Sequence, residues 1–140
     1  MKILLAVDGS PYTRKMLDYV CANRTLFDAS HSFTLFHVQP ALPPHARSAL
    51  GTTMVTDYYQ DESQKVLVPA LEALEAQGLK AESKWEVGHA GDTLAAHAQK
   101  GGYDMIIMGS QGHSSLARLV MGSVTTQVMA QCSVPMLLIR

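Results

Sequence analysis

Strand-like and helix-like segments alternate five times along this chain, and this alternation restricts the fold more than any other feature. The strand-like segments are residues 2–8, 31–38, 80–87, 103–108 and 134–140. Because parallel strands need a crossover that a helix can fill, the alternation predicts an α/β fold with a parallel sheet, helices on both faces and right-handed crossovers. In such folds ligands bind beyond the carboxyl ends of the strands, where the strand order reverses.

The sequence marks the intervening helices with unequal clarity. One helix is expected from Pro11 to the mid-twenties, because Ser10 can cap it and proline suits its first position. Shorter helices should begin at Asp92 and after Ser123. Residues 39–56 contain several prolines and no sustained period, so they are predicted to form a long irregular loop. A further helix follows that loop, with an apolar stripe at Val66, Leu67, Ala70, Leu71 and Leu74.

Residues 109–123 connect the fourth expected strand to the last expected helix. They contain Gly109, Gly112, Gly122 and Ser123. Glycine lets a backbone adopt positive φ and approach a ligand closely. The free N–H groups and the positive dipole end at a helix start form an anion site, and phosphate is the natural anion. The alternative interpretation is that these glycines merely end a strand and cap a helix.

Composition and charge argue against several other classes of protein. The chain has 140 residues, 47% hydrophobic and 16% charged, and is expected to fold as one domain, residues 1–140. A net charge of −1 with scattered basic residues argues against a nucleic-acid partner. No apolar run approaches the roughly 20 residues of a membrane span, and none follows the pattern of a secretory signal. We therefore expect a cytoplasmic protein without membrane contact, with Cys21 and Cys132 as reduced core residues.

Two residues separate Gly109 from Gly112, and nine residues separate Gly112 from Gly122-Ser123. This spacing resembles the nucleotide-binding signature of the universal stress protein family, in its ATP-binding branch. Residues 3–10, 36–38, 104–109 and 134–139 also resemble strands and turns of that family. The resemblance implies a Rossmann-like, five-stranded parallel sheet in the order 3-2-1-4-5. It also implies a homodimer formed through the last strand.

The resemblance further implies where a nucleotide binds. Ala6 and Val7 would line the base pocket, and Val38 would hold adenine through its backbone. Asp8 would lie beside the ribose or on the phosphate and metal side. Magnesium would accompany ATP and be held mainly by phosphate oxygens, because Mg²⁺ binds few protein carboxylates. The phosphates would be surrounded by Gly109, Gly112, Gly122, Ser123 and the N–H group of Val124.

The sequence lacks the signatures of several enzyme classes. No Gly-Lys-Ser or Gly-Lys-Thr follows the glycine loop, and no Gly-x-Ser-x-Gly elbow is present in it. The histidines show no metal-ligand spacing. Asp8, the one acid expected near the phosphates, is more typical of a group that orients a ligand than of a catalyst. His113 is expected to be a solvated loop residue and Arg118 a surface residue, although Arg118 could reach a phosphate.

The leading hypothesis is therefore a cytoplasmic, homodimeric stress-response or signalling module that binds Mg-ATP, without assigned catalytic or metal-ligating residues. A slow ATPase is the second hypothesis, and a dimeric stress scaffold that does not use nucleotide is the third. Valine in place of Gly109 or Gly122 is predicted to abolish nucleotide binding while leaving the fold largely intact.

Overall fold

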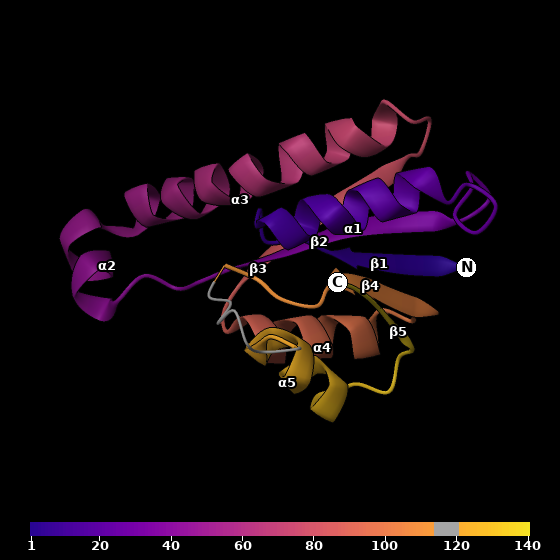
Figure 1. The fold of residues 1–140 in the computed structure, drawn as a ribbon. Coiled ribbons are helices and arrows are strands. Elements are labelled where there is room, and N and C mark those ends of the chain that lie inside the picture. Colours follow the sequence, from indigo (N-terminus) through magenta and orange to yellow (C-terminus); the bar gives the residue numbers. More distant parts are fainter. Residues whose placement is uncertain (114–120) are drawn as a thin grey trace.

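The computed structural model describes residues 1–113 and 121–140, and it confirms the predicted α/β architecture. All strands run parallel in one Rossmann-like sheet with the order β3-β2-β1-β4-β5 (Figure 1). The strands are β1 (Lys2–Ala6), β2 (Ser32–Gln39), β3 (Ala81–Val87), β4 (Met105–Gly109) and β5 (Met136–Ile139).

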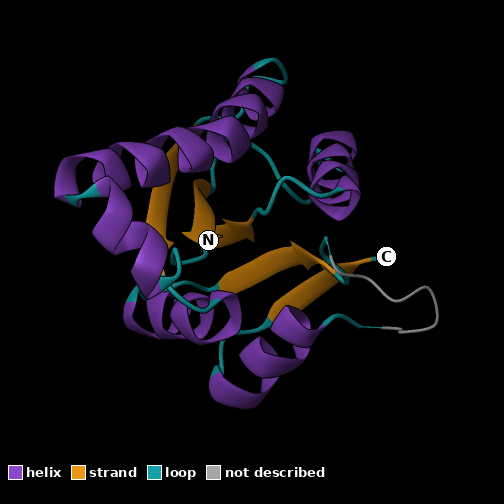
Figure 2. Ribbon diagram, turned by 90° about the vertical axis from the view of Figure 1, so that its left-hand side faces the viewer, coloured by secondary structure: helices purple, strands orange, loops and turns teal. Residues whose placement is uncertain are grey.

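Helices cover both faces of this sheet. Figure 1 and Figure 2 place α1 and α3 on one face and α4 and α5 on the other. Within the described residues, no helix is long and apolar enough to cross a membrane. The helices are α1 (Pro11–Ala22), α2 (Pro44–Leu50), α3 (Thr52–Glu75), α4 (Ala90–Lys100) and α5 (Ser123–Gln131).

The central strand β1 shows why both faces are apolar. Its side chains alternate between two cores: Ile3 and Leu5 pack in the core beneath α1 and α3, while Leu4 packs in the core beneath α4 and α5. All three side chains are completely buried. The continuous apolar run at residues 3–7 is therefore the sequence of a strand buried on both sides.

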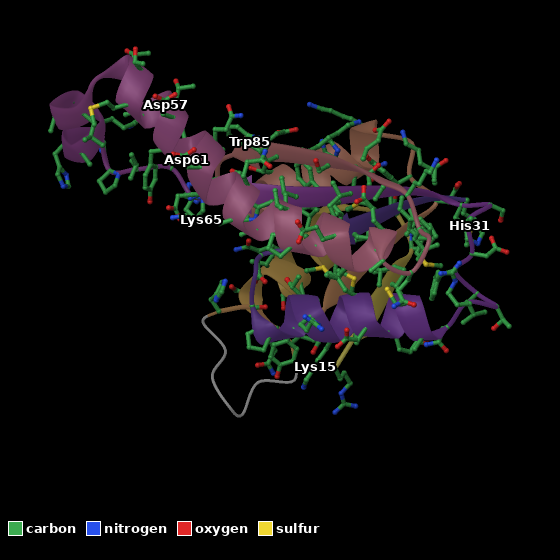
Figure 3. All side chains as sticks on the ribbon, turned by 90° about the horizontal axis from the view of Figure 1, so that it is seen from above. Lys15, His31, Asp57, Asp61, Lys65 and Trp85 are labelled. Carbon is green, nitrogen blue, oxygen red and sulfur yellow. The ribbon has the colours of Figure 1, made fainter. Side chains whose placement is uncertain are left out.

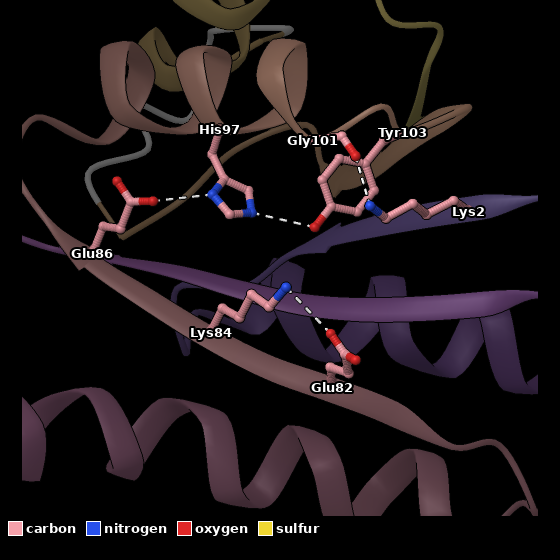
Figure 4. Close-up of polar contacts among 7 residues, drawn as sticks. All are labelled: Lys2, Glu82, Lys84, Glu86, His97, Gly101 and Tyr103. Carbon is pink, nitrogen blue, oxygen red and sulfur yellow. Dashed lines mark hydrogen bonds and ion pairs between the residues drawn. The ribbon is translucent and has the colours of Figure 1, made fainter.

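A polar cluster attaches α4 to the edge strand β3. The Nδ1 atom of His97 lies 3.0 Å from a carboxylate oxygen of Glu86, and its Nε2 atom lies 3.2 Å from the hydroxyl of Tyr103 (Figure 4). The imidazole also stacks on Phe36 of β2, with ring centroids 3.9 Å apart. These contacts fix α4 and Phe36 relative to each other beneath the carboxyl end of the sheet.

The prediction of a long irregular loop at residues 39–56 is wrong. Residues 44–50 form α2, and α3 begins at Thr52, well before the apolar stripe that the sequence shows. Pro43 and Pro44 do not prevent this, because they occupy the N-cap and the first position of α2. Gly51, with φ of +79°, separates the two helices.

The sequence of α2 and of the first half of α3 lacks a helical period of apolar residues for a physical reason. The first half of α3 extends away from the sheet together with α2 (Figure 1). Met54 on it is exposed, as are Asp57 and Asp61 (Figure 3). Because this half does not pack along the sheet, it needs no apolar stripe, and its sequence carries no periodic signal.

Candidate functional site

The pairing of the strands brings two turns together at the carboxyl edge of the sheet. Strand β1 pairs with β2 on one side and with β4 on the other. The turn after β1 leads to α1 on one face, whereas the segment after β4 leads to α5 on the opposite face. The point between β1 and β4 is therefore where the strand order reverses, and a crevice is expected there.

A pocket of about 530 Å³ occupies this position. Its volume lies in the range of small-molecule sites, roughly 300–1,000 Å³. All of the binding residues predicted from the sequence line it: Ala6, Val7, Asp8, Val38, Gly109, Gly112, Gly122, Ser123 and Val124. The structure thus brings these residues together, while their role in binding a ligand stays a prediction.

One end of the pocket is apolar. Phe36, Leu94 and Met108, which are buried, line it together with Ala6 and Val38. The Val7 N–H donates to the Phe36 carbonyl at 3.0 Å, and the Gly88 N–H donates to the Gln39 carbonyl at 3.0 Å. Because successive residues of a strand direct their backbone groups to opposite sides, those of Val38 point toward β1, beyond its last pair with β2.

The start of α5 forms another part of the pocket lining. Gly122 is the N-cap of this helix, and its N–H donates to the Ser110 carbonyl at 2.7 Å. The N–H groups of Ser123, Val124 and Thr125 have no hydrogen-bond partner in the part of the chain that the structure describes. Free N–H groups and the dipole at a helix start are suited to binding an anion.

Asp8 lies between the two strand-end turns. Its Oδ1 atom accepts hydrogen bonds from the Ser10 N–H at 2.9 Å and from the Thr13 hydroxyl at 2.8 Å. Its Oδ2 atom faces the glycine loop, since a Cβ added to Gly112 would lie 2.6 Å from it. The carboxylate is thus held through one oxygen, and the other is directed toward the loop.

His113 forms a hydrogen bond between the glycine loop and the turn after β1. Its Nε2 atom lies 2.6 Å from the Asp8 carbonyl oxygen and donates to it, because a carbonyl can only accept. The side chain is exposed, as expected for a loop residue, yet it also lines the pocket. Arg118 lies outside the described residues, so its role stays a prediction.

The loop glycines are required for a different reason from the one that the sequence suggested. Among the described glycines, positive φ occurs at Gly9, Gly51, Gly78 and Gly102, and not at Gly109, Gly112 or Gly122. At Gly109 and Gly112, lack of space for a Cβ atom replaces positive φ as the reason. A Cβ on Gly109 would lie 2.5 Å from the Cβ of Tyr12 in α1, so this glycine permits close packing of a helix on a strand. A side chain at Gly109 must displace α1, so Gly109→Val is expected to disturb the packing of this helix, contrary to the expectation that it leaves the fold largely intact.

Sequence reasoning missed several residues that line the pocket. Phe36, Leu94 and Met108 resemble ordinary core residues in the sequence, and only the end of the sheet reveals them as lining. Thr13 carries a weak signal, since it lies three residues after the N-cap Ser10. His37 carries a clearer one, because it is a titratable residue within an apolar strand, and it is only 5% exposed.

Comparison with known proteins identifies the family to which the chain is similar along its whole length. The universal stress protein family matches residues 1–140. Universal stress protein Slr1230 of Synechocystis sp. is 32% identical over 140 residues, which cover 99% of this chain but only 42% of Slr1230, so the chain spans less than half of that relative. Universal stress protein YxiE of Bacillus subtilis is 28% identical over 147 residues, and the match covers 99% of this chain and 98% of YxiE.

Solved structures have the same architecture. The hypothetical protein MJ0577 superposes with a TM-score of 0.81 at 28% identity, covering 99% of this chain and 94% of that chain. The universal stress protein from Archaeoglobus fulgidus in complex with dAMP has a TM-score of 0.71 at 20% identity. The superposition covers 100% of this chain and 98% of that chain. At that identity the likeness establishes the fold alone. Fold, strand order and the match along its entire length show that the chain belongs to the universal stress protein family.

Proposed function

We propose that this chain binds an adenine nucleotide, ATP with Mg²⁺, in the pocket at the carboxyl edge of the sheet, and that it acts as a cytoplasmic stress-response or signalling module. The observation that carries the proposal is the mixed lining of this pocket, which combines apolar side chains and an open strand backbone with free N–H groups at a helix start. An adenine nucleotide likewise combines a flat, largely apolar base with anionic phosphates. The dAMP complex of the Archaeoglobus fulgidus protein supports the choice of nucleotide.

The apolar end suits the base. Val38 directs a donor and an acceptor toward the space beyond β1. Adenine presents an acceptor, N1, beside a donor, the 6-amino group, along one edge. The two edges are complementary, and the side chains of Phe36, Leu94 and Met108 provide apolar contact for the faces of the ring.

The part of the pocket at the start of α5 suits the phosphates and a metal ion. No lysine or arginine is found among the described residues that line the pocket, so within this part of the chain backbone N–H groups, together with a bound cation, are the groups available to balance the phosphate charge. The Oδ2 atom of Asp8 faces this region. One carboxylate together with phosphate oxygens and water is the usual environment of Mg²⁺, so the residues present fit this ion.

Calorimetric titration of nucleotide-stripped protein tests the proposal. We expect Mg-ATP to bind with a Kd below 1 mM. GTP should bind at least tenfold more weakly, because its base edge does not match, and tenfold corresponds to about 1.4 kcal/mol of binding free energy. Removing Mg²⁺ with a chelator should weaken the binding of ATP. Absence of binding by any adenine nucleotide at millimolar concentration would contradict the proposal, and ADP formed in the same sample would favour a slow ATPase.

Two variants of Ser123 test anion binding at the start of α5. Ser123→Pro removes a backbone N–H at the first position of α5, which tolerates proline, and Gly122 already has the extended ψ of 166° that a residue before proline prefers. Ser123→Ala removes only the hydroxyl and is the matched control. We expect Ser123→Pro to weaken ATP binding about tenfold and to leave adenosine binding unchanged. Equal ATP affinity in the two variants would show that the N–H does not contact phosphate.

We also propose that the chain forms a homodimer through β5. The N–H groups of Ile106 in β4 and of Ser110, just after β4, donate to the carbonyls of Pro135 and Ile139. Met136 and Leu138 therefore direct their backbone groups away from the sheet. All four side chains of β5 are apolar and half-buried. An apolar strand with open backbone groups at a sheet edge is suited to pairing with a second copy.

A further inference from the structure

The hydrogen-bond ladder between β1 and β2 stops one bond short of where it could end. The Val7 N–H donates to the Phe36 carbonyl at 3.0 Å. In a parallel ladder the next bond would run from the Val38 N–H to the Val7 carbonyl. The described residues do not form that bond. The Val7 carbonyl instead accepts from the Nδ1 atom of His37, at 2.9 Å.

The side chain of His37 is firmly held in this position. It is 5% exposed, and its Nε2 atom lies 3.0 Å from the side-chain oxygen Oε1 of Gln39, a residue that is itself 9% exposed. Because a carbonyl oxygen can only accept, Nδ1 carries the proton in this arrangement. The imidazole therefore provides the Val7 carbonyl with a donor that does not come from the neighbouring strand.

The Val7 carbonyl thus has two possible donors, the His37 side chain and the Val38 N–H, and of these only His37 donates to it in the structure. Val7 is 4% exposed, and a buried carbonyl without a donor is costly, so one of the two must serve it. If the Val38 N–H did so, the ladder would extend into the pocket and Val38 would lose its donor for a ligand. With His37 in that role, the N–H of Val38 stays open.

We propose that His37 is a positioning residue for base recognition, which keeps the backbone of Val38 available to adenine by occupying the Val7 carbonyl. The inference about the base rests on the proposed nucleotide function. The inference about the ladder does not, because it concerns the protein without a ligand.

Two variants separate these roles. His37→Leu has a similar size and no donor, so the Val7 carbonyl should recruit the Val38 N–H. His37→Asn keeps an N–H near the position of Nδ1 and is the matched control. Amide hydrogen exchange of Val38 in the ligand-free protein, resolved by NMR, reports the state of the ladder. Titration with AMP and with ribose 5-phosphate reports recognition of the base separately from recognition of the phosphate.

We expect the Val38 amide of the ligand-free His37→Leu protein to exchange at least about tenfold more slowly than in the unchanged protein, because it gains a ladder hydrogen bond. In His37→Asn it should exchange as in the unchanged protein. AMP should bind His37→Leu about tenfold more weakly, the equivalent of one lost hydrogen bond, whereas ribose 5-phosphate should bind equally well.

Equal exchange of Val38 in the unchanged and His37→Leu proteins would overturn the role of His37 in the ladder. Slowed exchange with unchanged AMP affinity would overturn its role in base recognition. If His37→Leu does not fold, a slow Val38 amide in the ligand-free unchanged protein or in His37→Asn would be decisive against the proposal. If the unchanged protein binds no adenine nucleotide, the proposed function fails, and the exchange rates still decide the state of the ladder.

Discussion

At the scale of single residues, the clearest lesson concerns glycine, because neighbouring glycines are required for different reasons. Gly9 has φ of +77° and forms the turn after β1, whereas Gly109 has no unusual φ and instead lies against Tyr12 of α1. Gly122 caps α5 in an extended conformation that other residues also adopt. A glycine signature therefore combines positions at which the fold requires glycine with positions at which it does not.

This distinction predicts different effects of alanine at two glycines. In Gly109→Ala the new Cβ would lie 2.5 Å from the Tyr12 Cβ and 3.1 Å from its backbone carbonyl, so α1 must shift. We expect the free energy of unfolding to fall by about 1–3 kcal/mol, as for other overpacked sites. In Gly122→Ala the nearest atom, the Cα of Gln111, is 3.3 Å away, and a smaller loss is expected. Urea denaturation measures both, and equal losses would argue against this account.

Ser63 provides a prediction of the opposite sign. It lies on the inner face of α3, is 0% exposed, and its hydroxyl has no hydrogen-bond partner among the described residues. Ser63→Ala removes this unpaired group and keeps the helix, so stability should rise by up to about 1 kcal/mol. Thermal and urea unfolding would reveal the change. A clear loss of stability would mean that the hydroxyl has a partner.

Cys21 allows a test by pH. The pKa of its thiol is raised above the ordinary value, first by burial and then by the negative charge of Asp18. A raised pKa leaves less thiolate at a given pH, so Cys21 should react with iodoacetamide more slowly in the folded protein than in urea, and its rate should keep rising to higher pH. Mass spectrometry after timed alkylation measures this. Equal rates in the folded and unfolded chain would contradict the prediction.

At the scale of elements, α3 behaves as two different halves of one helix. Its second half packs Leu67, Ala70 and Leu74 in the core above the sheet, whereas its first half has few buried side chains and leads into α2. Hydrogen exchange is protected by burial and packing, not by helical geometry alone. The two halves should therefore differ in local stability.

Hydrogen exchange followed by mass spectrometry tests this difference. Peptides from residues 44–62 should exchange at least about tenfold faster than those from residues 66–75, because the first segment can open without disturbing the core. The central strand β1 serves as the slow reference. Uniform protection along α3 would show that another surface, such as that of a second copy, covers α2 and the start of α3.

At the scale of the whole molecule, the two edges of the sheet are chemically different. The edge strand β3 carries Glu82, Lys84 and Glu86, and the first two form an ion pair at 3.2 Å (Figure 4). Charged residues on an edge discourage pairing with another sheet. The opposite edge, β5, is Met136–Ile139 and has no charge within it. The asymmetry favours β5 as the surface that meets a second copy.

Proline at Leu138 tests that assignment. The N–H of Leu138 points away from β4, so Leu138→Pro removes a donor at the open edge and leaves the bonds to β4 in place. Sedimentation velocity should show a dimer for the unchanged chain and a monomer for this variant. Leu138→Ala, which keeps the N–H, is the control. A dimer that persists in Leu138→Pro would place the interface elsewhere.

The sequence by itself determined the parallel sheet and the alternation of its strands with helices, whereas the resemblance to the family supplied the residues that gather at its carboxyl edge. The sheet and the alternation follow from local patterns: the run at residues 3–7 must be buried on both faces, Ser10-Pro11 must start a helix, and parallel strands direct their ends to one side. Only the tertiary structure decided the helical state of residues 44–62, the contact of Gly109 with Tyr12 and the bond from His37 to Val7. Each of these depends on contacts, or on their absence, between segments distant in the chain, and no local pattern records such contacts.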